Sequence, residues 1–278
     1  MLYRVVVGAA LIAIAIAGGD ANTAALNSGY RVIADGERQS VDVELVLAVD
    51  VSYSMDPTEL LLQREGYAEA IVSREFLQAI KIGPNGRVSM VYIEWSGPND
   101  QTIVVPWRLI DGHESAAAVA AEIAKAPVRM GTRTSISGAI NFALPLFDAN
   151  PYRGLRRVID VSGDGVNNDG SPVTAARDAA LARGVTINGL PIMLQDVLPS
   201  QMDIDELDLY YEDCVIGGPG AFTVTIKRRD EFKTAIRAKL VLEVAGGTPR
   251  HRIVPAAERE PRISCLIGEA MWARRSRW

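Results

Sequence analysis

The chain has 278 residues, of which 48% are hydrophobic and 23% are charged, and these proportions exclude disordered, collagen-like and coiled-coil chains. Its two cysteines and two histidines exclude a disulfide-rich scaffold and leave little for a histidine-built metal site. The net charge of −5 is uneven: residues 248–278 hold seven arginines and three glutamates, whereas residues 21–247 hold 21 basic and 30 acidic residues, and such an acidic body lacks the basic footprint of a nucleic-acid-binding protein.

The N-terminus has the pattern of a secretory signal peptide. Arg4 precedes an apolar run at 5–17, and small residues follow the run, as in signal peptides that are removed on export. A membrane span takes about 20 apolar residues, so the run is short for one. We therefore expect a signal peptide over residues 1–25 and a bacterial protein that is periplasmic or secreted. The mature chain should have no integral membrane span; a retained membrane anchor is the alternative.

Strands and helices alternate over residues 41–246. Residues 43–51 are a nearly continuous apolar run, typical of a strand buried on both faces. Further strands are expected at 87–95, 102–107, 157–161, 185–190 and 222–226. Helices are expected at 57–80, 115–126, 136–147, 173–183, 204–213 and 229–245. This alternation predicts one α/β domain with a mainly parallel sheet covered on both faces, and the short link after residue 95 predicts one antiparallel strand.

The C-terminal part of the chain separates charges of opposite sign. Residues 186–226 contain seven acidic residues and no Lys or Arg, which indicates either a solvated acidic face or a docking surface for a basic partner. The basic segment 247–278 is expected to be a poorly ordered tail. Cys265 lies in this tail, and export would permit a disulfide between Cys214 and Cys265; two unpaired thiols are the equal alternative.

Polar side chains gather at two expected strand ends and in one loop. The set is Asp50, Ser52, Ser54, Thr134 and Asp164. Ligands of open α/β sheets bind at the carboxyl ends of strands, and alternate residues of a strand point to one side. Carboxylates and hydroxyls without thiolate or imidazole suit a hard cation: Mg²⁺, Mn²⁺ or Ca²⁺. Water or an acidic group of a partner would complete the coordination.

The order of these residues resembles a known site. The pattern Asp-x-Ser-x-Ser, a later Thr, and a strand-end Asp followed by Gly resembles the metal-ion-dependent adhesion site (MIDAS) of von Willebrand factor type A (vWA) domains. The stretches VELVLAVDVSYSM, GTRTSISGAI, RRVIDVSGDGVNNDG and GVTINGLPI are similar to the DUF1194 proteins, a bacterial subgroup. The resemblance covers about residues 41–246. It implies a three-layer Rossmann-like α/β domain with a mainly parallel central sheet, one antiparallel edge strand and helices on both faces.

The resemblance also implies the roles of individual residues. The implied metal ligands are Asp50, Ser52, Ser54, Thr134 and Asp164. Thr132 is the alternative to Thr134, which is preferred because its spacing to the following helix matches the family. Asp160 departs from the family pattern, because it places a carboxylate inside a strand that is usually apolar.

The function that the resemblance implies is binding. An exported module would use its cation to bind an acidic group of a protein partner. We expect no enzymatic activity, because the chain lacks a Gly-x-Ser-x-Gly nucleophile elbow, a phosphate loop and a His-Glu-x-x-His motif. A haloacid-dehalogenase-like phosphatase would need an aspartate where Ser52 stands. A metal-dependent hydrolase or phosphatase and a metal-braced structural protein are the alternatives.

Overall fold

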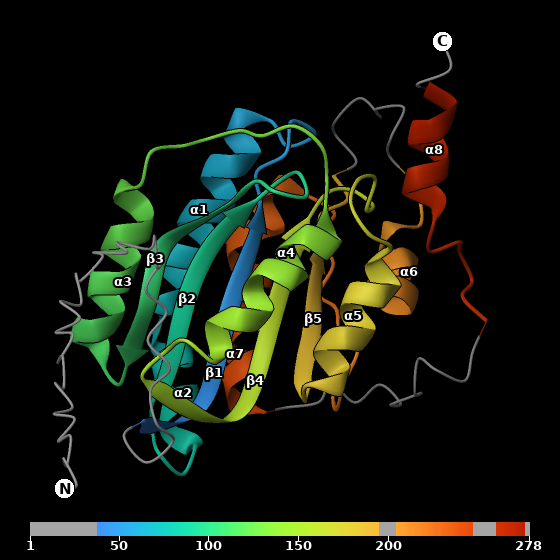
Figure 1. The fold of residues 1–278 in the computed structure, drawn as a ribbon. Coiled ribbons are helices and arrows are strands. Elements are labelled where there is room, and N and C mark those ends of the chain that lie inside the picture. Colours follow the sequence, from blue (N-terminus) through green and yellow to red (C-terminus); the bar gives the residue numbers. More distant parts are fainter. Residues whose placement is uncertain (1–37, 195–203, 247–259, 276–278) are drawn as a thin grey trace, which may run out of the picture. The chain divides into compact units, whose positions relative to one another are not determined.

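The computed structural model describes residues 38–194, 204–246 and 260–275 (Figure 1), and all of them belong to the compact unit Val32–Trp278. The expected signal peptide at 1–25 lies outside the described residues. So do residues 247–259 and 276–278 of the expected tail.

A five-stranded sheet forms the centre of this unit, with the strand order β3-β2-β1-β4-β5. The strands are β1 Gln39–Asp50, β2 Val88–Trp95, β3 Gln101–Ile110, β4 Tyr152–Gly163 and β5 Val185–Pro191. β1 runs parallel to β2 and β4, and β4 runs parallel to β5. Only the edge strand β3 is antiparallel among these five. The expected mainly parallel sheet with one antiparallel edge strand is confirmed.

Helices cover both faces of the sheet (Figure 1). One face carries α1 Pro57–Ile71, α2 Arg74–Ile82, α3 His113–Lys125 and α7 Phe232–Ala245; the other carries α4 Ile136–Ala143 and α5 Val173–Ala182. β1 supplies both hydrophobic cores: Val43 and Leu45 face the first group of helices, whereas Val46 and Ala48 face the second. This two-sided burial explains why its sequence is continuously apolar rather than alternating.

The long helix expected at 57–80 is two helices. α1 ends at Ile71 and α2 begins at Arg74, with Ser73 between them. The Ser73 side chain accepts a hydrogen bond from the backbone N–H of Phe76 and donates one to the carbonyl of Ala70. Serine favours such N-cap positions, and the cap starts a second helix.

Two further expected helices are shorter than the sequence indicated. α4 ends at Ala143, and a 3₁₀ turn, Leu144–Phe147, continues the chain. Pro145 lies in that turn, and proline lacks the N–H that an α-helix would need there. The helix expected at 204–213 is the single turn α6 Leu207–Tyr210, followed by the π-helical turn Tyr211–Val215.

The strand expected at 222–226 was wrong in its extent. The segment runs beside β5 but makes only isolated bridges, Thr223 with Gly189 and Ile226 with Ile192. Pro191 in β5 accepts a hydrogen bond from Ile226 through its carbonyl but has no N–H to donate, so a regular ladder cannot continue there.

The C-terminal segment differs from the expected poorly ordered tail. Within it, Ile267–Arg275 form a helix, α8. Cys265 is joined to Cys214 by a disulfide bond, which selects one of the two alternatives that the sequence left open. The disulfide bond and the packing of Ile263 and Ile267 against the core attach this segment to the domain. The basic composition of the segment does not reveal these contacts.

Asp160 has a cationic partner in the core. Its side chain is fully buried on β4, and Lys239 Nζ of α7 lies 2.6 Å from Asp160 Oδ1 and 2.6 Å from Glu243 Oε1. Asn188 of β5 donates a 2.6 Å hydrogen bond to Glu243. Buried charges are tolerated when they are paired with charges of opposite sign, as Asp160 and Glu243 are with Lys239. Asp160 thus belongs to a buried ion cluster that joins the sheet to α7.

Candidate metal centre

The first candidate ligand lies at the end of the central strand. Asp50 is the last residue of β1 and is fully buried. Its Oδ1 accepts a 2.7 Å hydrogen bond from the backbone N–H of Ser52. Its Oδ2 is buried and has no hydrogen-bond partner among the described residues. A buried carboxylate oxygen without a partner is costly, so this atom is placed to accept a ligand.

Ser52, Ser54 and Asp164 are in direct contact. Ser52 Oγ lies 2.9 Å from Ser54 Oγ, and Ser54 Oγ donates a 2.6 Å hydrogen bond to Asp164 Oδ1. Alternate spacing after β1 brings the two hydroxyls to one side, and β4, which pairs with β1, brings Asp164 to the same edge of the sheet.

Gly163 has no side chain and so leaves space beside the Asp50 carboxylate and the Tyr211 hydroxyl. A Cβ atom at this position would lie 2.7 Å from Asp50 Oδ2 and 3.0 Å from the Tyr211 hydroxyl. Any larger residue would therefore press on the unpartnered carboxylate oxygen. The next glycine, Gly165, lies beside Thr134: a Cβ atom there would be 3.6 Å from Thr134 Oγ1.

Thr134 is held at this place through its backbone. Its N–H donates a 3.0 Å hydrogen bond to Asn168 Oδ1, and its carbonyl accepts a 2.9 Å hydrogen bond from the Asn168 N–H. Its side chain is buried, whereas Thr132, the alternative ligand, is exposed. The loop after β4 thus holds Thr134 beside Gly165, the neighbour of Asp164 in the chain.

The segment that leads to Thr134 is also held by two arginines, the buried Arg64 and the partly buried Arg129. Arg64 of α1 forms an ion pair with the buried Glu94 and donates to the carbonyl of Ala126. Arg129 lies 2.7 Å from Asp100 and 3.6 Å from Glu94. Burial raises the pKa of Glu94, and the two arginines oppose that rise. The loop is therefore fixed by ion pairs at its start and by asparagine hydrogen bonds at its end.

The electrostatics of the site are those of an uncompensated carboxylate. Burial raises the pKa of Asp50 to about 7, and the hydrogen bond from Ser52 opposes the rise. Burial, together with the negative charges of Asp50 and Asp164, also raises the pKa of Tyr211. Nearby negative charge disfavours ionisation, whereas a cation would favour it. Burial is the main cause of both shifts, and a cation beside Asp50 Oδ2 would lower both pKa values.

The donor set fits a hard divalent cation. It consists of two carboxylates and three hydroxyls, all oxygen donors of the kind that Mg²⁺, Mn²⁺ and Ca²⁺ prefer. In the described ranges, no group of three or more His, Cys, Asp and Glu residues could hold a metal ion. A metal site here would therefore depend on the hydroxyls of Ser52, Ser54 and Thr134. Asp50 Oδ2, buried and unpartnered, is the atom that such an ion would satisfy.

Two neighbouring asparagines are functional candidates that the sequence did not single out. Asn168 pairs with the backbone of Thr134, as described above. Asn167 is fully buried, and its Oδ1 accepts a 3.0 Å hydrogen bond from the N–H of Ser137 at the start of α4. The run Asn167-Asn168-Asp169 directly after SGDG was the available signal, because turn residues that follow a strand-end ligand can bond to other loops.

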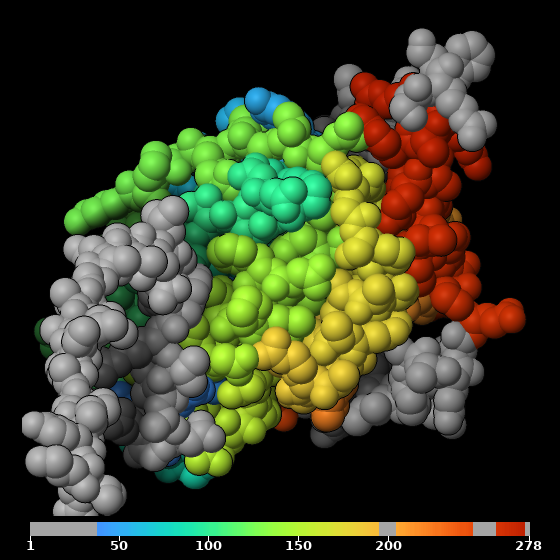
Figure 2. All heavy atoms as spheres, viewed as in Figure 1, coloured from blue at the N-terminus to red at the C-terminus, as the bar shows by residue number. Residues whose placement is uncertain are grey.

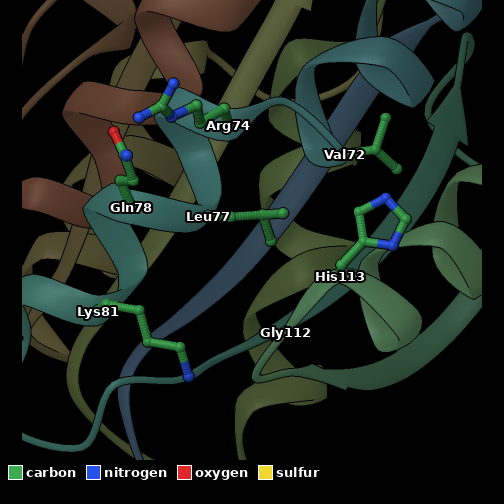
Figure 3. A pocket seen from close by; sticks show the side chains of 7 residues that line it. All are labelled: Val72, Arg74, Leu77, Gln78, Lys81, Gly112 and His113. Carbon is green, nitrogen blue, oxygen red and sulfur yellow. The ribbon is translucent and has the colours of Figure 1, made fainter.

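A pocket of about 520 Å³ lies elsewhere, between α2 and the start of α3 (Figure 3). It is lined by Val72, Leu77 and Lys81, with His113 on the α3 side (Figure 3). None of the five predicted metal ligands lines it. Lys81 Nζ already donates to the carbonyl of Asp111 at 2.6 Å. The pocket therefore adds nothing to the candidate metal centre.

Two tryptophans and part of the acidic stretch are accounted for within the fold. Trp95 is fully buried, and Trp107 donates a 3.2 Å hydrogen bond to the carbonyl of Leu146. In the acidic stretch, Glu212 and Asp213 pair with Arg262 of the C-terminal segment. Part of this acidic surface thus binds a basic residue of the same chain.

Comparison with known proteins identifies a family. The profile described as "Protein of unknown function (DUF1194)" matches residues 40–248. Among curated protein sequences, none matches this chain significantly. None of the helices in the described ranges has the length and hydropathy of a membrane span.

Several solved structures share the fold. Proximal thread matrix protein 1 from the mussel byssus is 14% identical with a TM-score of 0.53, covering 75% of this chain and 48% of that chain. A von Willebrand factor type A structure from Catenulispora acidiphila is 15% identical with a TM-score of 0.51, covering 74% and 43%. The pilus adhesin SpaC from Lactobacillus rhamnosus GG is 14% identical with a TM-score of 0.54, covering 75% and 31%.

These likenesses concern the fold alone. This chain matches less than half the length of each of the three proteins. The shared architecture is a mostly parallel sheet with one antiparallel edge strand and helices on both faces, the vWA fold. The mussel protein has also been solved with a zinc-occupied MIDAS motif, at 13% identity and a TM-score of 0.48.

Proposed function

Because the chain belongs to the DUF1194 family and has the vWA fold, we propose that it is an exported binding module that holds a divalent cation and uses it to bind a protein partner. The cation is Mg²⁺, with Mn²⁺ and Ca²⁺ as the other candidates. Its ligands are Asp50, Ser52, Ser54, Thr134 and Asp164.

One observation carries this proposal. The Oδ2 atom of Asp50 is buried without a partner, next to a chain of contacts formed by Ser52, Ser54 and Asp164. Oxygens of the buried Asp160 and Glu94 also lack a hydrogen bond, but each of these carboxylates has a cationic partner, Lys239 or Arg129, and Asp50 has none among the described residues. A buried carboxylate oxygen with neither kind of partner costs free energy. A divalent cation would satisfy Asp50 Oδ2 and would also neutralise Asp164. The geometry therefore supports a cation at the carboxyl ends of β1 and β4.

The proposed partner supplies an acidic group. When bound, the ion would have a coordination position that the five side chains do not fill. A carboxylate of the partner would fill this position with an oxygen ligand and would place a negative charge next to the cation. We assign the following roles to the side chains of this chain. Asp50 and Asp164 balance charge, Ser52 and Ser54 orient their hydroxyls toward one point, and Asn168 holds Thr134 in place.

Export is part of the proposal. The signal-peptide pattern at residues 1–25 and the disulfide between Cys214 and Cys265 support it, because such bonds persist in oxidising compartments. We also propose binding rather than catalysis. The candidate centre contains no imidazole, and both cysteines of the chain are in the disulfide. Phosphatase or esterase activity that requires Mg²⁺ and Asp50 would contradict this part.

Calorimetric titration of Mn²⁺ and Mg²⁺ tests the cation site. We expect Asp50→Asn and Ser54→Ala to weaken binding by more than about tenfold, since even substitutions of residues that only orient metal ligands commonly cost that much. Asp205→Asn is the matched control, because it removes the same charge from an exposed position. Equal affinity in Asp50→Asn and the wild type would refute the proposed site.

The partner is tested by capture from a periplasmic extract. Immobilised wild-type protein should retain a partner in Mg²⁺ and release it in EDTA, and Asp50→Asn should retain none. A protein captured equally by Asp50→Asn does not use the cation. If Asp50→Asn captures every protein as well as the wild type does, the ion does not bridge to a partner, even if calorimetry shows that the ion binds.

A further inference from the structure

The C-terminal segment 260–275 lies at the edge of the sheet where the candidate metal centre is found. In Figure 1, α8 lies at the upper end of the view, where β1 and β4 lead into their loops. In Figure 2, the red atoms of this segment lie directly beside yellow atoms of the chain that follows β4. The profile of the family ends at residue 248, so this segment lies beyond the part of the chain that the family match covers.

The segment is attached to the domain at its beginning. The Cys214–Cys265 disulfide is a covalent attachment. Arg262 donates to Glu212 at 2.6 Å and to Asp213 at 2.8 Å. Ile263 and Ile267 pack against the hydrophobic core that also contains Cys214. These contacts bring α8 to the loops without engaging any of the five candidate ligands.

The first turn of α8 contacts the loop that follows Asp164. Glu269 Oε1 accepts a 2.8 Å hydrogen bond from Asn167 Nδ2. The other end of the same amide, Oδ1, accepts from the Ser137 N–H. Nδ2 also donates a 3.1 Å hydrogen bond to the carbonyl of Ser171, so Glu269 and Ser171 together fix which way the amide points. Gly268 is buried against this loop, and a Cβ atom there would overlap the backbone oxygen of Asn167. The helix therefore docks through a position that only glycine can occupy.

A later residue of α8 contacts the loop that carries Thr134. The guanidinium carbon of Arg133 lies 3.4 Å from the ring centroid of Trp272. Arg133 has a φ of 73°, the only positive φ of a non-glycine residue among those described. Such a conformation is costly and persists only where surrounding contacts hold it. Trp272 is one of those contacts, and Arg133 directly precedes Thr134.

We propose that the segment 260–275 is a structural part of the cation site, in which Glu269 and Trp272 are positioning residues. Through Asn167 and Arg133 they hold the two loops that supply Asp164 and Thr134. The disulfide keeps them there. Residues that orient metal ligands commonly change metal affinity by about 10–100-fold. The inference rests on the proposed function for its ligand, but the positioning of the loops can be measured without the ion.

The first test compares variants of α8 in the full-length protein. Glu269→Ala and Trp272→Ala should weaken Mn²⁺ binding by about tenfold in calorimetric titration. Glu269→Gln keeps an oxygen that accepts from Asn167 and should bind like the wild type. Arg274→Ala, an exposed change on the same helix, is the control. Equal loss in Glu269→Ala and Glu269→Gln would overturn the role of this hydrogen bond.

A second pair of variants separates docking from helix formation. Gly268→Ala favours the helix through its propensity but pushes α8 away from Asn167, so we expect weaker Mn²⁺ binding. Ala270→Gly has the opposite effect on propensity at an exposed position and should leave binding unchanged. Unchanged affinity in Gly268→Ala would show that docking of α8 does not matter to the site.

Hydrogen exchange of the metal-free protein gives a readout that does not depend on the ion. Amides in 131–138 and 164–171 should exchange faster in Glu269→Ala, Trp272→Ala and Gly268→Ala than in the wild type, whereas amides of β1 should not. Unchanged exchange in both loops would overturn the inference. If the wild-type protein binds no Mn²⁺, the proposed function is wrong, and the exchange result alone decides whether the segment positions the loops.

Discussion

Asp50 and Asp160 are both fully buried carboxylates, but their surroundings differ. Asp160 lies 2.6 Å from Lys239, and burial raises its pKa to about 6 although this cation opposes the rise. Burial alone would lower the pKa of Lys239, but Asp160 and Glu243 together raise it, so the lysine stays charged. Asp50 has no such partner among the described residues. One carboxylate is paired with a cation of the same chain, and the other is left for a ligand.

The buried cluster predicts a pH dependence of stability. Because the folded-state pKa of Asp160, about 6, exceeds its ordinary value of 3.8, its contribution is present below pH 3.8 and is lost as the pH rises through about 6. Asp160→Asn removes this loss. In the wild type, this loss should lower the free energy of unfolding by about 2 kcal/mol between pH 4.5 and pH 7.5. In Asp160→Asn, this part of the decrease should be absent.

Urea unfolding at the two pH values measures this difference. Asp205→Asn, an exposed control of the same charge change, should follow the wild type. A pH dependence in Asp160→Asn that equals that of the wild type would mean that Asp160 titrates at its ordinary pKa in the folded protein.

The candidate ligands were predictable from the sequence, and their supporting residues were not. Asp50, Ser52 and Ser54 share a local spacing after an apolar strand, and Asp164 follows another strand, so strand ends predicted that these four residues lie close together. The choice of Thr134 over Thr132 came from the family resemblance. Lys239 and Asp160 are far apart in the chain and share no local pattern. Asn167 and Glu269 are 102 positions apart, and only the folded chain shows that they are bonded.

The strands were more predictable than the helix boundaries. Apolar runs and turns located β1 to β5, including the antiparallel member, because burial imposes a strong pattern on sequence. Helix ends depend on single side chains. Ser73 divides one expected helix, and Pro145 shortens another. The expected strand at 222–226 has the right apolar pattern but meets Pro191 of β5, which cannot complete the ladder.

The start of α1 offers a test of local structure near the candidate centre. Asp56 accepts hydrogen bonds from the N–H groups of Thr58 and Glu59, and Glu59 accepts one from the Asp56 N–H. A hydrogen bond from Arg229 is the main cause that lowers the pKa of Asp56. Asp56→Ala should lower the free energy of unfolding by about 1–2 kcal/mol, measured by urea denaturation.

A second substitution at the same position identifies the cause. Asp56→Ser keeps an N-cap acceptor and loses the pairing with Arg229, so it should recover most of the stability that Asp56→Ala loses. Equal losses in the two variants would assign the effect to Arg229 rather than to the cap.

The uneven charge of the chain has a structural counterpart in the molecule. Acidic residues of the domain, Glu212 and Asp213, pair with Arg262 of the basic C-terminal segment. Partly exposed pairs of this kind contribute little free energy individually. Their part in the fold is to hold this segment against the domain next to the disulfide, which provides most of the attachment.

The disulfide should stabilise the whole molecule. Its two cysteines are 51 positions apart, and in the chain-entropy account a cross-link over such a loop contributes about 4 kcal/mol by restricting the unfolded chain. We expect the double variant Cys214→Ser with Cys265→Ser to lose stability of this order in urea unfolding. A loss below about 1 kcal/mol would mean that strain or residual structure cancels the effect. Hydrogen exchange separates this global effect from the local one at the two loops.

The pairing of β1 with β4 has a consequence for how the protein is made. Ser54 and Asp164 are 110 positions apart in the chain, yet their side chains are 2.6 Å apart in the fold. A chain synthesised from its N-terminus cannot form this site until Asp164 has been made and the distant strands have paired, and such non-local pairing is slow. A nascent or partly folded chain therefore cannot form the proposed cation site. Cation binding would require that β1 and β4 have already paired.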